Sequence, residues 1–165
     1  MGRRVKVRDN NNIPNVLSII EELNSKKLEI GIFGDDDGDM VKIASVHEFG
    51  ATINRKGSRK DGTSYSFQIN IPERSFLRST FDNEVDDMTD LMQQLIERRV
   101  LTGRMSVDAF YQAIGEELVS RIRRTIRNLD TPPNAESTIK KKRSSSPLID
   151  DGHLRRSITW RVVDK

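Results

Sequence analysis

The chain has 165 residues, enough for one domain whose core needs no metal or disulfide bond. Charged residues make up 32% of it, and no apolar run approaches the roughly 20 residues that span a bilayer. The absence of cysteine excludes disulfides, thiol catalysis and Cys-based zinc sites. The first residues are basic with no apolar stretch after them, so we do not expect a secretory signal.

The net charge of +3 hides an asymmetry along the chain. Residues 1–120 carry 16 Lys/Arg against 20 Asp/Glu, whereas residues 121–165 carry 12 against 5. The basic part is therefore expected to face something acidic. Nucleic acid and the acidic part of a neighbouring copy both fit this expectation.

The first third of the chain alternates helix and strand patterns. Residues 1–12 are basic and Asn-rich, which predicts a short strand or a loose arm. Pro14 opens an apolar helical face that runs to Leu23. A strand over Leu28–Phe33 is expected to stop at the turn GDDDGD, and a short helix is expected over Met40–Phe49.

The middle of the chain contains the clearest strand and helix patterns. Residues 51–64 are polar and basic, which predicts a flexible surface loop. Apolar residues alternate strictly with polar ones from Tyr65 to Ile71, which is typical of a strand. An apolar stripe predicts a helix over Glu84–Arg99. After a cap at Ser106, apolar residues recur every four positions from Phe110 to Ile126.

The last part is expected to be mostly irregular. Asp130-Thr131-Pro132-Pro133 should end the preceding helix, and a second flexible loop is expected over 130–147. A helical turn around Leu154 and a strand over Ser157–Val163 follow. The prediction is a single α+β domain over 1–165. It consists of a small mixed or antiparallel sheet packed against two long helices, with shorter helices and long flexible loops.

Common catalytic and metal-binding patterns are incomplete. His47 begins HEFG, but the second histidine of HExxH would fall at Ala51, so a structural polar contact is the better interpretation. The acidic run at Asp35–Asp39 lacks the glycine and glutamate spacing of a calcium loop, leaving solvated carboxylates or a docking patch for a basic neighbour. Phosphate-binding and serine-hydrolase patterns are missing as well. We therefore predict no enzyme, cofactor or metal.

The basic residues near the end of the chain allow two interpretations. Arg121, Arg123, Arg124 and Arg127 lie mostly opposite an apolar stripe, as on a solvated helix face. The candidate docking or DNA-channel contacts are Lys140, Lys141, Lys142, Arg143, Arg155 and Arg156. Interleaved aromatics and helix-turn-helix or zinc-finger patterns are absent, so any DNA contact should be non-specific. A small non-specific DNA-binding protein is the alternative function.

Four blocks together show a resemblance to a known family. IASVHEFGATI (43–53), IPERSFLRSTFD (71–82), PPNAESTIKKK (132–142) and PLIDDGHLRRSITWRV (147–162) resemble the virion-morphogenesis or tail-completion proteins of tailed bacteriophages. The resemblance covers about 120 residues. Ser75 stands where the family favours proline and Asp151 where it favours threonine, and both changes are expected in exposed turns.

The resemblance implies a non-enzymatic structural virion protein at the head–tail junction, made in the host cytoplasm. Such proteins complete the tail or neck, commonly as a homo-oligomeric ring, here expected to be sixfold, around the DNA channel. The expected partners are further copies, neighbouring neck or tail-tube proteins and genomic DNA in the channel, with no membrane.

A ring needs apolar surface between its subunits. The candidate interface residues are Phe76, Leu77, Leu148, Ile149 and Leu154, with Arg74 bridging to a carboxylate nearby. Ordinary core packing is the alternative interpretation of the five apolar residues.

Overall fold

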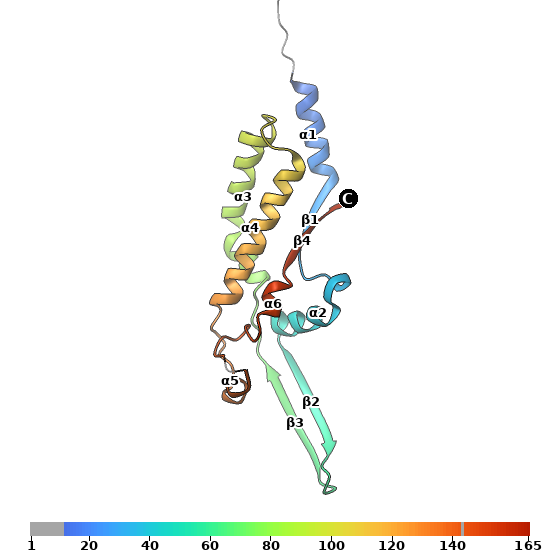
Figure 1. Cartoon of the computed structure of the whole chain (residues 1–165), viewed down its shortest axis with the longest axis vertical. Coiled ribbons are helices and arrows are strands. Elements are labelled where there is room, and N and C mark those ends of the chain that lie inside the picture. Colours follow the sequence, from blue (N-terminus) through green and yellow to red (C-terminus); the bar gives the residue numbers. More distant parts are fainter. Residues whose placement is uncertain (1–11, 143) are drawn as a thin grey trace, which may run out of the picture.

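The computed structural model describes residues 12–142 and 144–165. These residues form six α-helices, a short π-helical segment and two antiparallel sheets of two strands each, which confirms the α+β class. The molecule is elongated, with a helical body and one β-hairpin that projects from it (Figure 1). Apart from Asn12, the predicted basic arm lies outside the described residues.

In chain order the elements are α1 (Ile13–Ser25), β1 (Lys26–Gly31), α2 (Gly34–Phe49), β2 (Ala51–Ser58), β3 (Ser64–Ile71), α3 (Arg78–Leu95), the π-helical segment η1 (Ile96–Val100), α4 (Val107–Asn128), α5 (Glu136–Lys142), α6 (His153–Arg156) and β4 (Thr159–Asp164). None of the helices in the described part is long and apolar enough to cross a membrane.

The two long helices lie side by side as an antiparallel pair (Figure 1). Their apolar stripes meet in a buried cluster that includes Met88, Phe110 and Ile114. The predicted cap is confirmed, because the Ser106 hydroxyl accepts a hydrogen bond from the Ala109 N–H at 3.1 Å. The predicted start of α3 at Glu84 is wrong, since the helix already begins at Arg78.

The sheet on the helical body pairs the strand that follows α1 with the last strand of the chain. β1 pairs antiparallel with β4, with Lys26 opposite Asp164 and Gly31 opposite Thr159. The sheet packs on α4, and the hydroxyl of Tyr111 donates to the Leu23 carbonyl at 2.8 Å, which ties the end of α1 to α4. A predicted sheet against the long helices is therefore present.

The acidic segment begins a helix instead of forming only a turn. α2 starts at Gly34 and is kinked at Asp37, whose carboxylate accepts the Met40 N–H at 2.9 Å and so caps the helix after the kink. Asp37 also contacts His153 Nε2 at 3.0 Å, and Asp35 pairs with Arg161 at 3.1 Å. Part of this acidic patch is thus engaged within the chain.

Both predicted flexible loops contain regular structure. Residues Ala51–Ser58 form β2, which pairs with β3 through a turn at 59–63, so the predicted loop at 51–64 is wrong for most of its length. The sequence did not predict this strand because its side chains are mostly polar. They are polar because the strand is exposed along most of its length. The predicted loop at 130–147 contains α5, although α4 does end before the prolines, as predicted.

Candidate functional site

The four blocks that carry the resemblance meet at the base of the projecting hairpin. Their centre is Glu48, a carboxylate that is only 3% exposed. Its oxygens accept the N–H groups of Phe76, Leu77 and Arg78 at 2.8–3.0 Å and the Ser75 hydroxyl at 2.7 Å. Glu48 therefore caps α3 from α2, which explains why that helix begins at Arg78.

The protonation of Glu48 follows from these contacts. Burial by itself raises the pKa of a carboxyl group, but the N–H groups of Leu77 and Arg78, with the Ser75 hydroxyl, hold the pKa of Glu48 below its ordinary value of 4.5. Ser75 is half-buried and part of this cap, so the expectation that it lies in an exposed turn is wrong. Asp151 is exposed, as expected, and accepts the His153 N–H at 2.8 Å.

Arg74 connects the block at 71–82 to the block at 132–142. Its side chain is buried, with Nε donating to the Pro132 carbonyl at 2.8 Å and an Nη to the Pro133 carbonyl at 2.9 Å. Its own N–H donates to the His47 carbonyl at 2.7 Å. The prediction that Arg74 bridges to a carboxylate is wrong, because its hydrogen-bond partners among the described residues are carbonyl oxygens.

His47 lies beside Arg74. The structural polar contact predicted for its side chain is not found at Nδ1. Nδ1 is buried and has no hydrogen-bond partner among the described residues. Burial, followed by the charges of Arg74 and Lys142, lowers the pKa of His47. The imidazole is therefore expected to be neutral at pH 7.

We expect Arg74→Lys to destabilise the fold by about 1–2 kcal/mol. A lysine ammonium is a point donor and cannot reproduce the planar fork that reaches two carbonyls. Thermal unfolding measures the loss, with Arg104→Lys as control because Arg104 is exposed in the turn between the long helices. Equal stabilities of the two variants would contradict the role given to Arg74.

The predicted apolar interface residues lie mainly in the core. Phe76 is fully buried, and Leu148 and Leu154 are 4% and 6% exposed, in one cluster with Ile126 and Ile158. Leu77 and Ile149 are half-buried and pack against the same cluster. The interface assignment is therefore wrong for Phe76, Leu148 and Leu154, whose burial stabilises the chain itself, by about 1.5–3 kcal/mol for each large side chain.

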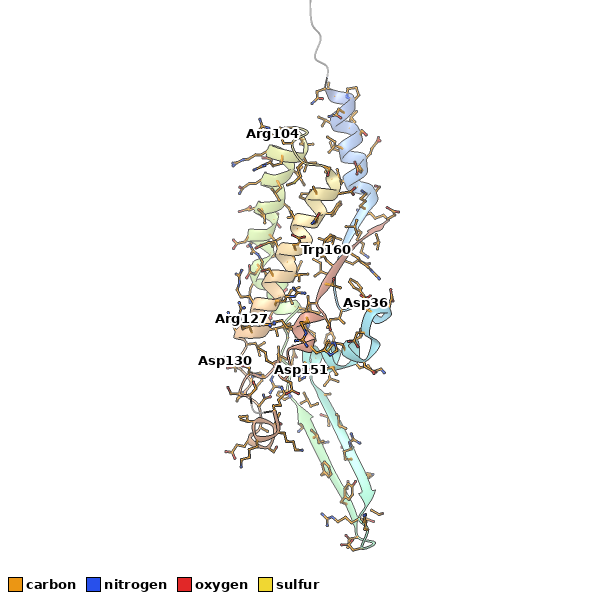
Figure 2. All side chains as sticks on the ribbon, viewed as in Figure 1. Asp36, Arg104, Arg127, Asp130, Asp151 and Trp160 are labelled. Carbon is orange, nitrogen blue, oxygen red and sulfur yellow. The ribbon has the colours of Figure 1, made fainter. Side chains whose placement is uncertain are left out.

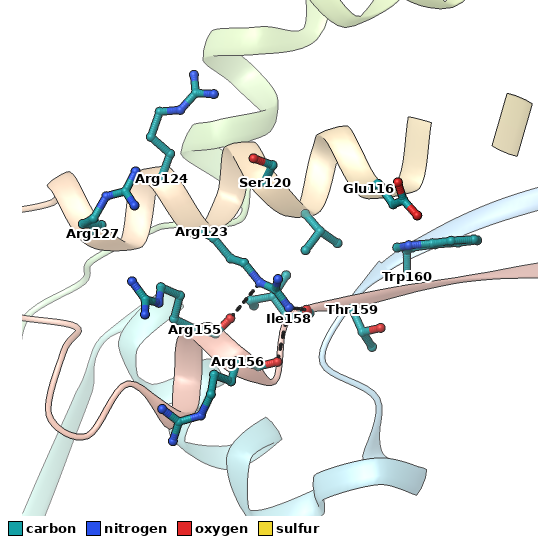
Figure 3. Close-up of a pocket in the computed structure, with 11 residues that line it drawn as sticks. Glu116, Ser120, Arg123, Arg124, Arg127, Arg155, Arg156, Ile158, Thr159 and Trp160 are labelled. Atoms are coloured by element: carbon teal, nitrogen blue, oxygen red, sulfur yellow. Dashed lines mark hydrogen bonds between the residues drawn. The ribbon is translucent and has the colours of Figure 1, made fainter. Parts of the chain in front are cut away.

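The predicted basic contacts fall in two places. Lys140, Lys141 and Lys142 lie on α5, where Lys142 Nζ donates to the Pro147 carbonyl at 3.0 Å. Arg143 lies outside the described residues. Arg155 and Arg156 lie on α6, where Arg156 donates to the Asp151 carbonyl at 2.9 Å and its side chain extends away from α4 (Figure 3).

A groove lined by arginines lies between α4, α6 and the start of β4 (Figure 3). Its volume is about 740 Å³, and its cations are Arg123, Arg124, Arg127, Arg155 and Arg156. We call it the arginine groove. Trp160 lines the other end of the arginine groove, so one aromatic ring lies beside the basic residues. The sequence analysis did not predict this aromatic contact.

Among the described residues, no carboxylate forms a salt bridge with the arginines of this groove, although the carboxylate of Glu116 lines its Trp160 end. Arg123 donates to the carbonyls of Arg155 and Ile158 at 3.1 and 2.9 Å. By contrast, Arg121 pairs with Glu84 and Glu117, and Arg161 pairs with Glu29 and Asp35. The arginine groove therefore presents positive charge that an external anion can neutralise.

Comparisons of the chain with protein-family models, with curated proteins and with solved structures found no match.

Proposed function

We propose that this chain is a structural virion protein of a tailed bacteriophage that completes the head–tail junction as a homo-oligomer. The observation that carries the proposal is the meeting of the four resembling blocks. Each block is weak alone, but Glu48 and Arg74 connect three of them by direct hydrogen bonds, and Phe76 packs with Leu148 from the fourth. Residues coupled in one fold are expected to occur together, which supports a shared fold with that family.

The shape and charge of the chain fit an assembly subunit. A ring of identical subunits needs two different faces that complement each other. The molecule is long, carries a projecting hairpin (Figure 1), and has the arginine groove between α4, α6 and β4 (Figure 3). Opposite charges on the two contacting faces would orient such an association.

The location is tested by labelling. An epitope tag on the chain, detected with gold-conjugated antibody by electron microscopy, should mark the head–tail junction of particles released from cells that carry the tagged gene. Label confined to the tail tip or the head surface, or no label on any particle, would contradict the proposal. An untagged strain serves as control.

The arginine groove supports a second candidate function, non-specific binding of DNA. Five arginines that each neutralise one phosphate predict that log K falls against log salt with a slope of about −4.5. Duplex oligonucleotide binding, followed by fluorescence anisotropy at several salt concentrations, measures the slope.

We expect Arg124→Gln with Arg127→Gln to reduce the magnitude of this slope by about 1.8. Both guanidinium groups are exposed and line the groove, so the change removes two phosphate contacts without disturbing the core. The matched control is Arg98→Gln with Arg99→Gln, an exposed pair on η1. No binding at low salt, or equal slopes for the two double variants, would exclude the groove as a DNA site.

A further inference from the structure

The β2–β3 hairpin has one polar face and one apolar face. Across the two strands, Thr52 Oγ1 donates to Asn70 Oδ1 at 3.1 Å and Gln68 Nε2 donates to Asn54 Oδ1 at 3.1 Å. The other face carries the alternating apolar residues, with Ile53 opposite Ile69, and one charged residue, Arg55, opposite Phe67. Such alternation is typical of a strand with one buried face.

The apolar face is not buried in this chain. Tyr65, Phe67 and Ile69 are 37%, 52% and 39% exposed, and the hairpin projects from the body (Figures 1 and 2). The Tyr65 and Phe67 rings stack with their centroids 5.7 Å apart. An isolated two-stranded hairpin is at best marginally stable in water, so a partner that covers this face would stabilise it.

The body of the same chain carries an apolar groove between α3, α4 and β1. Its volume is about 500 Å³, and apolar side chains such as Leu28, Val85, Met92 and Leu118 line it. Phe81 also lines this groove, and its side chain is 64% exposed. Methionine side chains adapt their shape to an incoming surface.

The charges around these two surfaces are opposite. Residues 51–71 of the hairpin carry four Lys/Arg against one Asp, and α3 carries one Arg against five Asp/Glu. Asp82 and Glu84 of α3 line the groove together with Arg78, and Glu84 pairs with Arg121. The basic, apolar hairpin therefore matches the apolar lining of the groove and the net negative charge of α3 beside it.

We propose that the apolar face of the β2–β3 hairpin of one copy docks in the groove between α3, α4 and β1 of a second copy. The choice of a second copy as occupant rests on the proposed function, which requires contacts between copies, and on the charge match. Hairpin and groove are different surfaces, so the contact is heterologous and propagates from copy to copy until a ring closes.

Two substitutions test the hairpin and the groove separately. Phe67→Ser damages the hairpin and leaves the groove intact, whereas Phe81→Ser damages the groove and leaves the hairpin intact. Both side chains are mostly exposed, so little change in stability is expected, and circular dichroism checks this. Each variant alone should associate at least about tenfold more weakly than the unmodified chain.

Mixing the two variants is the decisive step. The intact hairpin of the Phe81→Ser copy should dock in the intact groove of the Phe67→Ser copy, giving a heterodimer that cannot grow further. Native mass spectrometry detects this dimer at concentrations where the unmodified chain forms larger oligomers. Leu17→Ser, which removes a 54% exposed apolar residue from α1, should assemble like the unmodified chain.

The absence of cysteine allows a second measurement on the same contact. Phe67→Cys and Phe81→Cys chains with different tags should form an intermolecular disulfide when mixed and oxidised. Leu17→Cys chains mixed with Phe81→Cys chains should not.

Three results would overturn hairpin docking. They are normal assembly of Phe81→Ser, a mixture of the two serine variants that stays monomeric, and an unmodified chain that is monomeric at every concentration. The head–tail role is decided separately by the position of the label in particles. A chain labelled at the junction but assembled by another surface would overturn only the docking proposal.

Discussion

Glu48→Ala is expected to destabilise the chain by about 3–5 kcal/mol. The substitution removes a buried charge and leaves the N–H groups of Phe76, Leu77 and Arg78, just before and at the start of α3, without their acceptor. For a domain of this size the loss corresponds to a fall in the melting temperature of roughly 6–20 °C. Differential scanning calorimetry measures it.

The control separates the cap from ordinary surface charge. Glu48→Gln keeps the shape and one acceptor oxygen but places an amide donor against backbone donors, so we expect about 2 kcal/mol of destabilisation. Glu73→Gln removes a mostly exposed carboxylate that pairs with Arg78 at 2.7 Å, and should cost less than about 1 kcal/mol. Equal losses of stability in Glu48→Gln and Glu73→Gln would contradict the capping role of Glu48.

The same carboxylate predicts a dependence of stability on pH. Because the pKa of Glu48 is lower in the folded chain than its ordinary value of 4.5, the folded state binds this proton less readily than the unfolded state. The contribution of Glu48 is fully present above about pH 4.5 and is lost as the pH falls through the lowered pKa. Urea unfolding between pH 3 and pH 7 should show a smaller acid loss in Glu48→Gln than in the unmodified chain.

Gly115→Ala is expected to destabilise the chain by about 2–3 kcal/mol, although alanine is the better helix former. Gly115 is buried on α4 under the Trp160 ring, and an added Cβ would lie 2.6 Å from Trp160 Cγ. The ring and β4 must then move away from the helix, and overpacking of this kind outweighs the roughly 1 kcal/mol gained in helix propensity. Urea unfolding measures the change.

The single tryptophan of the chain reports the same displacement by fluorescence. Emission of Gly115→Ala should shift to the red as the ring gains contact with water. Gly38→Ala is the control, because an added Cβ there meets nothing within 4 Å. It should leave stability and emission nearly unchanged. A Gly115→Ala variant as stable as the unmodified chain would show that Trp160 does not need this close approach.

Local patterns predicted the elements whose own residues determine them. The four-residue recurrence predicted α4, which ends at Asn128, and strict alternation predicted β3. The start of α3 was missed because its cap, Glu48, comes from a helix some 30 residues earlier. β2 was missed because polar side chains do not distinguish an exposed strand from a loop, and its pairing with β3 decides the conformation.

In the candidate sites too, the sequence predicted individual residues but not the contacts between distant parts of the chain. Arg155 and Arg156 were predicted as anion contacts, but their meeting with Arg124 and Arg127 depends on how α6 packs against α4. The spacing of Arg123, Arg124 and Arg127 on one side of a helix was the available signal. For Phe76, Leu148 and Leu154, sequence left core and interface equally open, because an apolar residue suits both, and the structure places them in the core.

Deletion of the gene, followed by electron microscopy of the resulting particles, most directly tests whether this chain joins phage heads to tails. We predict DNA-filled heads and separate tails that do not join, and restored infectious particles when the gene is supplied on a plasmid. Infectious, fully joined virions from the deletion strain would contradict the proposed function.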